Sequence, residues 1–230
     1  MTSLGAIFEE ARRLDGPLAD RLTYYAQGLG RDAPGLASAY ATFIDRLRVA
    51  EAGTDAPMPG DALPPFLLPD QSGSLVASPD LLQSGPLVIS FNRGHWCSFC
   101  RLEVLALAQL SERLAGLRTR LVSITPERAI YAQALREQTG FSWPVLTDID
   151  LAYAMSLGLA VPVGDALGVV LRAADVDLSV YHGSNAWFLP IPATFVVAQD
   201  GRILARHVDP DFRHRMEPEA ILAVLADVRA

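Results

Sequence analysis

Short apolar segments alternate with helical segments over the last two thirds of this chain, and this order constrains its fold more than any other feature. From about Phe66 onward, apolar runs of strand length are followed by stretches with apolar residues three and four positions apart. The run from Leu87 to Phe91 is the clearest strand, and residues 98–117 carry leucines and valines at helical spacing. This order predicts an α/β fold, with a central mixed sheet and helices on both faces.

The rest of this region follows the same alternation. We expect strands at 120–124 and 144–146, helices at 127–138 and 151–157, and an insertion with one helix at 163–189. A β-hairpin is predicted over 193–208, turning near Asp200 and Gly201. The last helix starts at Pro218, because proline is favoured in the first helical turn.

The first fifty residues have a helical pattern rather than the alternating pattern of the later region, and we predict that they form a helical extension. Two apolar stripes recur there at helical spacing: Leu4, Ile7, Phe8, Ala11 and Leu14, then Leu36, Tyr40, Phe43 and Leu47. A Pro-, Gly- and Asp-rich segment follows. We therefore divide the chain into an extension at 1–50, a linker at 51–62 and a main domain at 63–230.

The two stripes must be buried, either on the chain's own sheet or against a second subunit. Short helices gain most of their stability from such packing. We favour a homodimer, since the proline-rich linker lets the helices reach away from their own domain and twofold dimers are the commonest soluble assembly.

Charge and composition exclude several classes of protein. The net charge is -7 and no long basic tract occurs, which argues against a nucleic-acid binder. No segment approaches the roughly 20 uncharged apolar residues that a membrane span needs. The N-terminus lacks the basic start and apolar run of a signal peptide. Two cysteines are too few for a disulfide scaffold, so we expect a reducing, cytoplasmic location.

Both cysteines lie in "FNRGHWCSFCRLEV", at the point where a strand gives way to a helix. A helix N-terminus carries unpaired N–H groups and a partial positive charge, which lower the pKa of a nearby thiol. Cys97 should feel this most, and Cys100, one turn in, should be more buried. Cys97 is then expected to attack substrate, and Cys100 to resolve the adduct as a Cys97–Cys100 disulfide. Arg93 and Arg101 flank the site and add positive potential.

Two other interpretations of this pair stay open. A zinc site needs two more ligands, and His207 and His214 are the histidines nearest to a suitable spacing. The thiols could also be inert and merely packed. The sequence of strand, Cys-x-x-Cys and helix, with no other cysteine, favours redox chemistry.

Other residues are weaker candidates. His95 is a candidate to touch substrate or tune Cys97, and Trp96 to shield the dithiol from water. Arg213, His214 and Arg215 form a basic cluster that is either a solvated face or a site for an anionic substrate.

Pro192 directly precedes a predicted strand. Such a position often holds a cis peptide bond in a tight turn, and a cis proline beside a dithiol would expose the preceding carbonyl to substrate. We predict that the Ile191–Pro192 bond is cis and lies within contact distance of Cys97.

Several segments, in order, resemble the peroxiredoxin-like branch of the alkyl hydroperoxide reductase / thiol-specific antioxidant (AhpC/TSA) family, within the thioredoxin-fold superfamily. They are "PGDALPPFLLPDQSG", "FNRGHWCSFCRLEV", "LVSITPE", "FSWPVLTD", "PIPATFVVAQDGRI" and "HVDPDFRHRMEPEAIL". The resemblance covers about Asp61 to Ala230. It implies a thioredoxin-like fold, with Cys97 as the attacking cysteine, Cys100 as its resolving partner and Pro192 as the cis proline.

The chain departs from the family pattern at three places. Gly94 and Ser90 stand where typical peroxiredoxins have Thr or Ser and Pro, and Pro192 stands where they have an Arg that polarises the peroxide. Thioredoxins have a buried Asp where this chain has Phe91. The active centre therefore looks thioredoxin-like on a peroxiredoxin-like body.

These features together predict a thiol-dependent antioxidant oxidoreductase that cycles a Cys97–Cys100 dithiol and disulfide to reduce disulfides or hydroperoxides. The expected reductant is a thioredoxin-type protein or a small thiol, and no bound cofactor or metal is expected. The substrate-positioning residues are expected to be Pro192, Trp96, His95 and Arg93. The alternative is a non-enzymatic redox-sensing or zinc-binding interaction protein.

Overall fold

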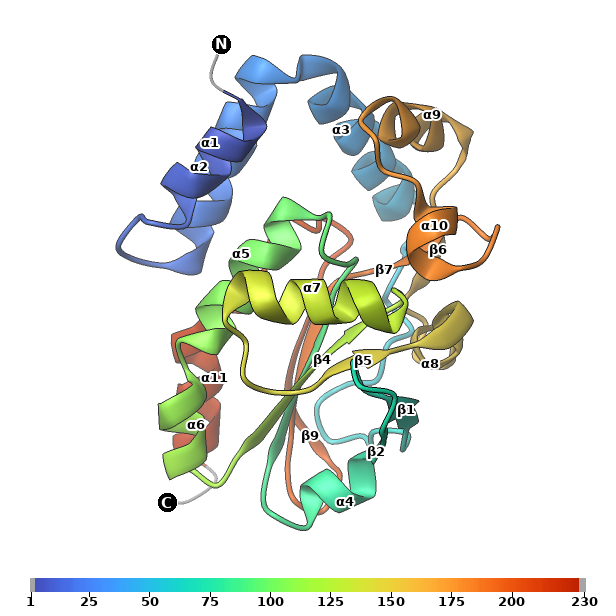
Figure 1. Ribbon diagram of the computed structural model, residues 1–230. Helices are drawn as coiled ribbons and strands as arrows, with labels where there is room; N and C mark the ends of the chain where they lie inside the picture. The colour runs from blue at the N-terminus through green and yellow to red at the C-terminus, as the bar shows by residue number, and fades with distance from the viewer. Residues whose placement is uncertain (1–2, 228–230) are drawn as a thin grey trace.

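A five-stranded mixed sheet forms the centre of the computed structural model, which describes residues 3–227 (Figure 1). Its order is β5-β4-β3-β8-β9, with bounds β3 (Leu87–Phe91), β4 (Arg120–Thr125), β5 (Val145–Thr147), β8 (Ala193–Val197) and β9 (Ile203–Val208). The first three strands are parallel, β8 is antiparallel to β3, and β9 is antiparallel to β8. The predicted mixed sheet and the predicted hairpin are confirmed.

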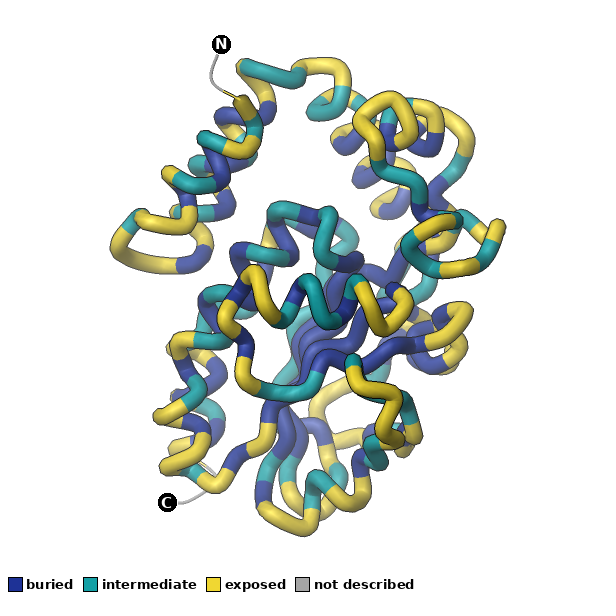
Figure 2. Tube along the Cα trace, in the orientation of Figure 1, coloured by how far each residue is buried: buried dark blue, intermediate teal, exposed yellow. Residues whose placement is uncertain are grey.

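The central strands are buried on both faces, which explains why they are continuous apolar runs (Figure 2). Side chains alternate between the two faces, since successive residues of a strand point to opposite sides. Val88 on β3, Leu121 on β4 and Val196 on β8 are paired across the sheet and share one core with helices α5, α7 and α11. Ile89, Val122 and Phe195 belong to the core on the other face.

The helices of this region are α4 (Ser78–Leu82), α5 (Ser98–Ala108), α6 (Ser111–Gly116), α7 (Ala129–Thr139), η1 (Ile149–Leu151), α8 (Ala152–Ser156) and α11 (Pro218–Asp227). A small hairpin of β1 (Leu67–Pro69) and β2 (Leu75–Ala77) precedes them. The single helix predicted over 98–117 is wrong, because the chain breaks at Gln109 and Leu110 into α5 and α6. The break leaves both Leu110 and Leu114 buried.

The N-terminal extension is helical, as predicted, and forms α1 (Leu4–Ala11), α2 (Leu18–Asp32) and α3 (Pro34–Val49). The two stripes lie on α1 and α3, whereas neither stripe predicts α2 between them. The apolar faces of these helices pack against the chain's own main domain. The rings of Tyr25 and Phe99 lie 5.1 Å apart, and those of Tyr40 and Phe212 lie 4.9 Å apart. The stripes are therefore buried without a second subunit, which removes the reason for favouring a homodimer, and the homodimer itself stays a prediction.

Residues 51–62 run as turns along β9 rather than reaching away from it. Gly60 donates to the carbonyl of Ile203, whose own N–H donates to the carbonyl of Asp61. The guanidinium of Arg206 donates to the carbonyls of Ala56 and Pro57. The linker is thus tied to the sheet, and the division into domains stays a prediction.

The predicted insertion contains two helices, not one. It runs from β6 (Ala160–Pro162) through α9 (Asp165–Ala173) and α10 (Leu178–His182) to β7 (Phe188–Pro190). An antiparallel pairing of β6 with β7 closes its base. Helix α9 packs against α3, so the insertion and the N-terminal helices together cover the end of the sheet from which α5 starts (Figure 1). We call this layer of α1–α3 and α9 the cap.

Candidate functional site

The Cys-x-x-Cys motif occupies the turn between β3 and α5, as the sequence predicts. Gly94 in this turn has a φ of 121°, a conformation that favours glycine. Cys97 is the N-cap residue of α5, and its Sγ accepts a hydrogen bond from the backbone N–H of Cys100 at 3.4 Å. The strand, the turn and the helix start therefore fix the position of the first thiol.

The two thiols are in contact and buried. Their Sγ atoms lie 2.8 Å apart, and both cysteines are free. Cys97 is 2% exposed and Cys100 is fully buried. A disulfide between them can form without any large movement of the chain.

Arg93 lies directly on this thiol pair. Its Nη2 donates to Cys97 Sγ at 3.0 Å, and its backbone N–H donates to Cys100 Sγ at 3.4 Å. The guanidinium is buried and stacks 3.5 Å above the Phe212 ring, while its Nε and Nη1 have no partner among the described residues. A cation held this closely stabilises negative charge on the sulfurs.

A second buried cation reaches the thiol pair from the C-terminal side. Arg215 Nη2 lies 3.6 Å from Cys100 Sγ, and its Nη1 donates to Glu103 Oε2 at 2.9 Å. Ser90 and Thr194 donate to the other oxygen of Glu103. Burial, opposed by Arg215, raises the pKa of Glu103 to about 7. A buried carboxylate thus lies behind the second thiol, although Phe91 holds the place of the thioredoxin Asp.

The thiols ionise as a coupled pair. Burial and the hydrogen bond shared with Cys100 raise the pKa of Cys97, against the attraction of Arg93. Burial alone would raise the pKa of Cys100 as well. The hydrogen bond from Cys97, together with the charges of Arg215 and Arg93, outweighs burial and lowers the pKa of Cys100 well below its usual value. The bond from Cys97 and the nearby Arg215 thus favour the thiolate on the deeper thiol, and the assignment of Cys97 as the attacking cysteine stays a prediction.

His95 lies in the same turn but bonds to Glu127 rather than to the thiols. Its Nδ1 lies 2.7 Å from Oε1 of the buried Glu127, and its backbone N–H donates to Oε2 at 2.7 Å. Its ring stacks on Tyr131 and meets the edge of Tyr181. These contacts fix the turn, and a Cβ on Gly94 would come within 2.2 Å of the Glu127 carboxyl carbon. Glycine therefore replaces the family's Thr or Ser here for a steric reason.

The prediction of a cis bond before Pro192 is wrong, since no peptide bond within residues 3–227 is cis. The chain runs from β7 into β8 with only Ile191 and Pro192 between the strands, so no tight turn requires the cis form. Ala193 pairs with Phe91 across the sheet, which places Pro192 beside the start of the motif turn.

A pocket of about 270 Å³ opens onto Cys97 beneath the cap. Cys97, Arg93 and Trp96 are in its wall, and Cys100, His95 and Pro192 are not among its lining residues. Trp96 also stacks near Arg93, with 5.3 Å from the guanidinium carbon to the ring centre. Cys97 is therefore the thiol that a small molecule meets first.

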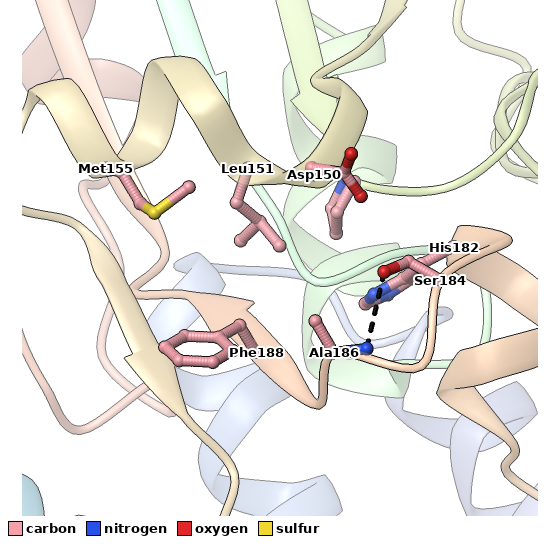
Figure 3. Close-up of a pocket in the computed structure, with 8 residues that line it drawn as sticks. Asp150, Leu151, Met155, His182, Ser184, Ala186 and Phe188 are labelled. Atoms are coloured by element: carbon pink, nitrogen blue, oxygen red, sulfur yellow. Dashed lines mark hydrogen bonds between the residues drawn. The ribbon is translucent and has the colours of Figure 1, made fainter.

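A second pocket, of about 330 Å³, lies away from the thiols (Figure 3). Asp150, Leu151 and Met155 from η1 and α8 face Phe188 from β7 and the segment with His182, Ser184 and Ala186. His182 has no partner for either ring nitrogen among the described residues, and burial lowers its pKa to about 4. No cysteine lines this pocket.

The three residues of the predicted basic cluster, Arg213, His214 and Arg215, have different partners. Arg213 pairs with Asp211, and His214 with Asp209. Only Arg215 reaches the thiols. In residues 3–227 no group of three or more His, Cys, Asp or Glu side chains is placed to hold a metal ion.

Sequence reasoning missed Glu103, Glu127 and the connection of Arg215 to the thiols. A signal for Glu103 existed, since it lies three residues after Cys100 on the stripe that carries Val104 and Leu107. A charged residue on a buried face is rare unless it is paired.

Comparisons with known proteins show the family and similar folds. Residues 59–206 match the AhpC/TSA family. The fold is similar to a solved peroxidoxin, BcpB from Mycobacterium tuberculosis, at 22% identity and a TM-score of 0.59 over 75% of this chain and 99% of that chain. AhpC from Enterococcus faecalis is also similar, at 16% identity and a TM-score of 0.56 over 75% and 92%. A search of curated proteins found no match.

None of the helices within the described residues is long and apolar enough to cross a membrane. Helices α1–α3 lie outside the matched range, so the family likeness does not extend to most of the cap.

Proposed function

The chain belongs to the AhpC/TSA family, and from this premise we propose that it is a thiol-dependent peroxidase that cycles Cys97 and Cys100 between dithiol and disulfide. The observation that carries the proposal is the contact of Arg93 with Cys97 in the wall of a small pocket. Arg93 supplies, from a different position, the guanidinium that Pro192 replaces in the family pattern.

The first half of the cycle oxidises Cys97. Cys97 passes its proton to the Cys100 thiolate across the 2.8 Å contact and attacks the distal oxygen of the hydroperoxide. The O–O bond breaks, the leaving alkoxide takes up a proton to give an alcohol, and Cys97 becomes a sulfenic acid. Arg93 stabilises the negative charge that moves from sulfur to oxygen.

The second half closes and then reopens the disulfide. Cys100 attacks the sulfenic sulfur, and water leaves as the Cys97–Cys100 disulfide forms. Two thiols of a reductant return the two electrons and leave as their own disulfide. The cycle uses only cysteine sulfur, so the proposal includes no bound cofactor.

Burial favours hydroperoxides over protein disulfides as substrates. The Cys97 residue is 2% exposed beneath the cap, and a folded protein cannot bring a disulfide to it without opening α1–α3. The same barrier applies to a thioredoxin-type reductant, whereas a small thiol can enter the pocket.

Stopped-flow oxidation of the reduced protein tests this proposal. We expect hydrogen peroxide and cumene hydroperoxide to oxidise the dithiol faster than a protein disulfide does. Cys97→Ser should slow the reaction by roughly 10³-fold or more. Cys100→Ser should stop at a sulfenic acid that a selective probe detects. Faster oxidation by the protein disulfide would make the chain a disulfide reductase instead.

A further inference from the structure

The pocket at Cys97 is lined mostly by apolar side chains and by two arginines. Leu4, Phe8, Leu29 and Leu36 from the N-terminal helices and Leu171 and Val176 from the insertion supply apolar side chains. Arg93 and Arg101 are its charged residues, and no carboxylate lines it. The whole chain has a net charge of -7, so the pocket differs from the rest of the protein in carrying positive charge, and this charge favours binding of an anion.

The two arginines differ in what they already bind. The Arg93 guanidinium donates to Cys97, whereas the guanidinium of Arg101 has no hydrogen bond or ion pair with any residue from 3 to 227. The Arg101 Nε is buried, and its guanidinium carbon lies 4.0 Å from the centre of the Phe8 ring. Leaving such a donor buried and unpaired costs free energy that a bound acceptor would recover.

The nearest acidic group does not satisfy Arg101. Glu9 is the carboxylate that acts on it most strongly, and Glu9 is paired with Arg12 and Arg13 on the outer side of α1. The guanidinium therefore remains available to a ligand that enters beneath α1. An arginine fork matches a carboxylate bidentately.

We infer that Arg101 binds the carboxylate of a small acidic molecule with an apolar body, while the other end of that molecule reacts at Cys97. The inference rests on the proposed function and names the ligand class of the same site. Arg101 follows Cys97 by four residues on one helix, which separates the two positions by about 6 Å along its axis. The ligand therefore carries its carboxylate and its reacting group several bonds apart, with the apolar part against Phe8 and Leu36.

A matched pair of hydroperoxides tests the assignment. The probes are cumene hydroperoxide with a para-carboxylate and the methyl ester of the same compound, with hydrogen peroxide as an uncharged reference. Arg101→Gln should slow oxidation by the acid about 10-fold or more, and change the rates with the ester and hydrogen peroxide by less than about 2-fold. Arg101→Lys should restore much of the rate with the acid, since it keeps the charge.

The control variant is Arg120→Gln, which removes one exposed positive charge at the far end of β4. It should leave the preference for the acid unchanged. If Arg101→Gln slows the acid and the ester equally, the residue only supports the pocket and the inference is overturned. Melting curves of each variant show whether the fold is retained.

The carboxylate could belong to the hydroperoxide or to the thiol that reduces the disulfide, and a reductive experiment separates these sources. The protein is oxidised with diamide and reduced with 3-mercaptopropionate or 2-mercaptoethanol. A loss confined to reduction by the mercaptoacid in Arg101→Gln assigns the carboxylate to the reductant. No charge-dependent loss in either experiment overturns the inference. Failure of the proposed function looks different, because hydroperoxides would then not oxidise even the unaltered protein.

Discussion

At the residue scale, two charged groups near the thiols come from positions other than those in the peroxiredoxin and thioredoxin patterns. Arg93 brings a guanidinium to Cys97, and Glu103 brings a buried carboxylate to the rear of Cys100 through Arg215. The chemistry that the site can perform depends on these contacts rather than on the motif alone.

The pH dependence of stability should report Glu103. Its pKa is raised from the ordinary 4.5 to about 7 in the folded chain, so between these values the folded state binds more protons than the unfolded state. The free energy of unfolding should then fall as pH rises from about 5 to 7. Glu103→Gln should flatten this slope in urea titrations, although it lowers stability overall because Arg215 loses its charged partner.

The matched control is Glu112→Gln, on the exposed surface of α6. It should keep the slope of the unaltered protein. If Glu103→Gln and Glu112→Gln show the same pH dependence, the raised pKa of Glu103 does not contribute to stability.

At the element scale, α1 is positioned by close contact with α2. A Cβ on Gly28 would lie 2.5 Å from Ile7 Cγ2, whereas a Cβ on Gly30 of the same helix would meet nothing within 4 Å. Gly30→Ala should therefore stabilise the chain by about 0.5–1 kcal/mol, as expected for glycine in a helix. Gly28→Ala should destabilise it by about 1–3 kcal/mol through overpacking. Chemical denaturation measures both, and equal effects would show that α1 does not depend on this contact.

Elements with a clear period could be predicted from the sequence, and those set by tertiary contact could not. The strand from Leu87 to Phe91 and the helix that ends at Gly140 are local patterns, and both are found. The break at Gln109 and the second helix of the insertion depend on packing between distant segments. The same holds for the site. Cys97 and Cys100 are close in sequence and could be predicted as a pair, whereas Arg215 is more than a hundred residues away from Cys100 and contacts it only in the folded chain.

At the scale of the whole molecule, the cap changes where a second subunit can bind. The stripes of α1 and α3 are buried within the chain, so they do not mark the interface of a homodimer, which stays a prediction. Met155 and Phe188 are 55% and 38% exposed on facing walls of the second pocket (Figure 3). Exposed apolar side chains gathered at one place mark interaction surfaces.

We therefore expect the protein to sediment as a dimer that pairs through the second pocket. Met155→Asp places a charge in this apolar surface and should shift the sedimentation coefficient to that of a monomer. Val49→Asp is the matched control, because Val49 is 87% exposed at the end of α3 and does not line this pocket. If the unaltered chain is a monomer, the dimer prediction fails. If Val49→Asp alone dissociates it, the subunits pair through the cap instead.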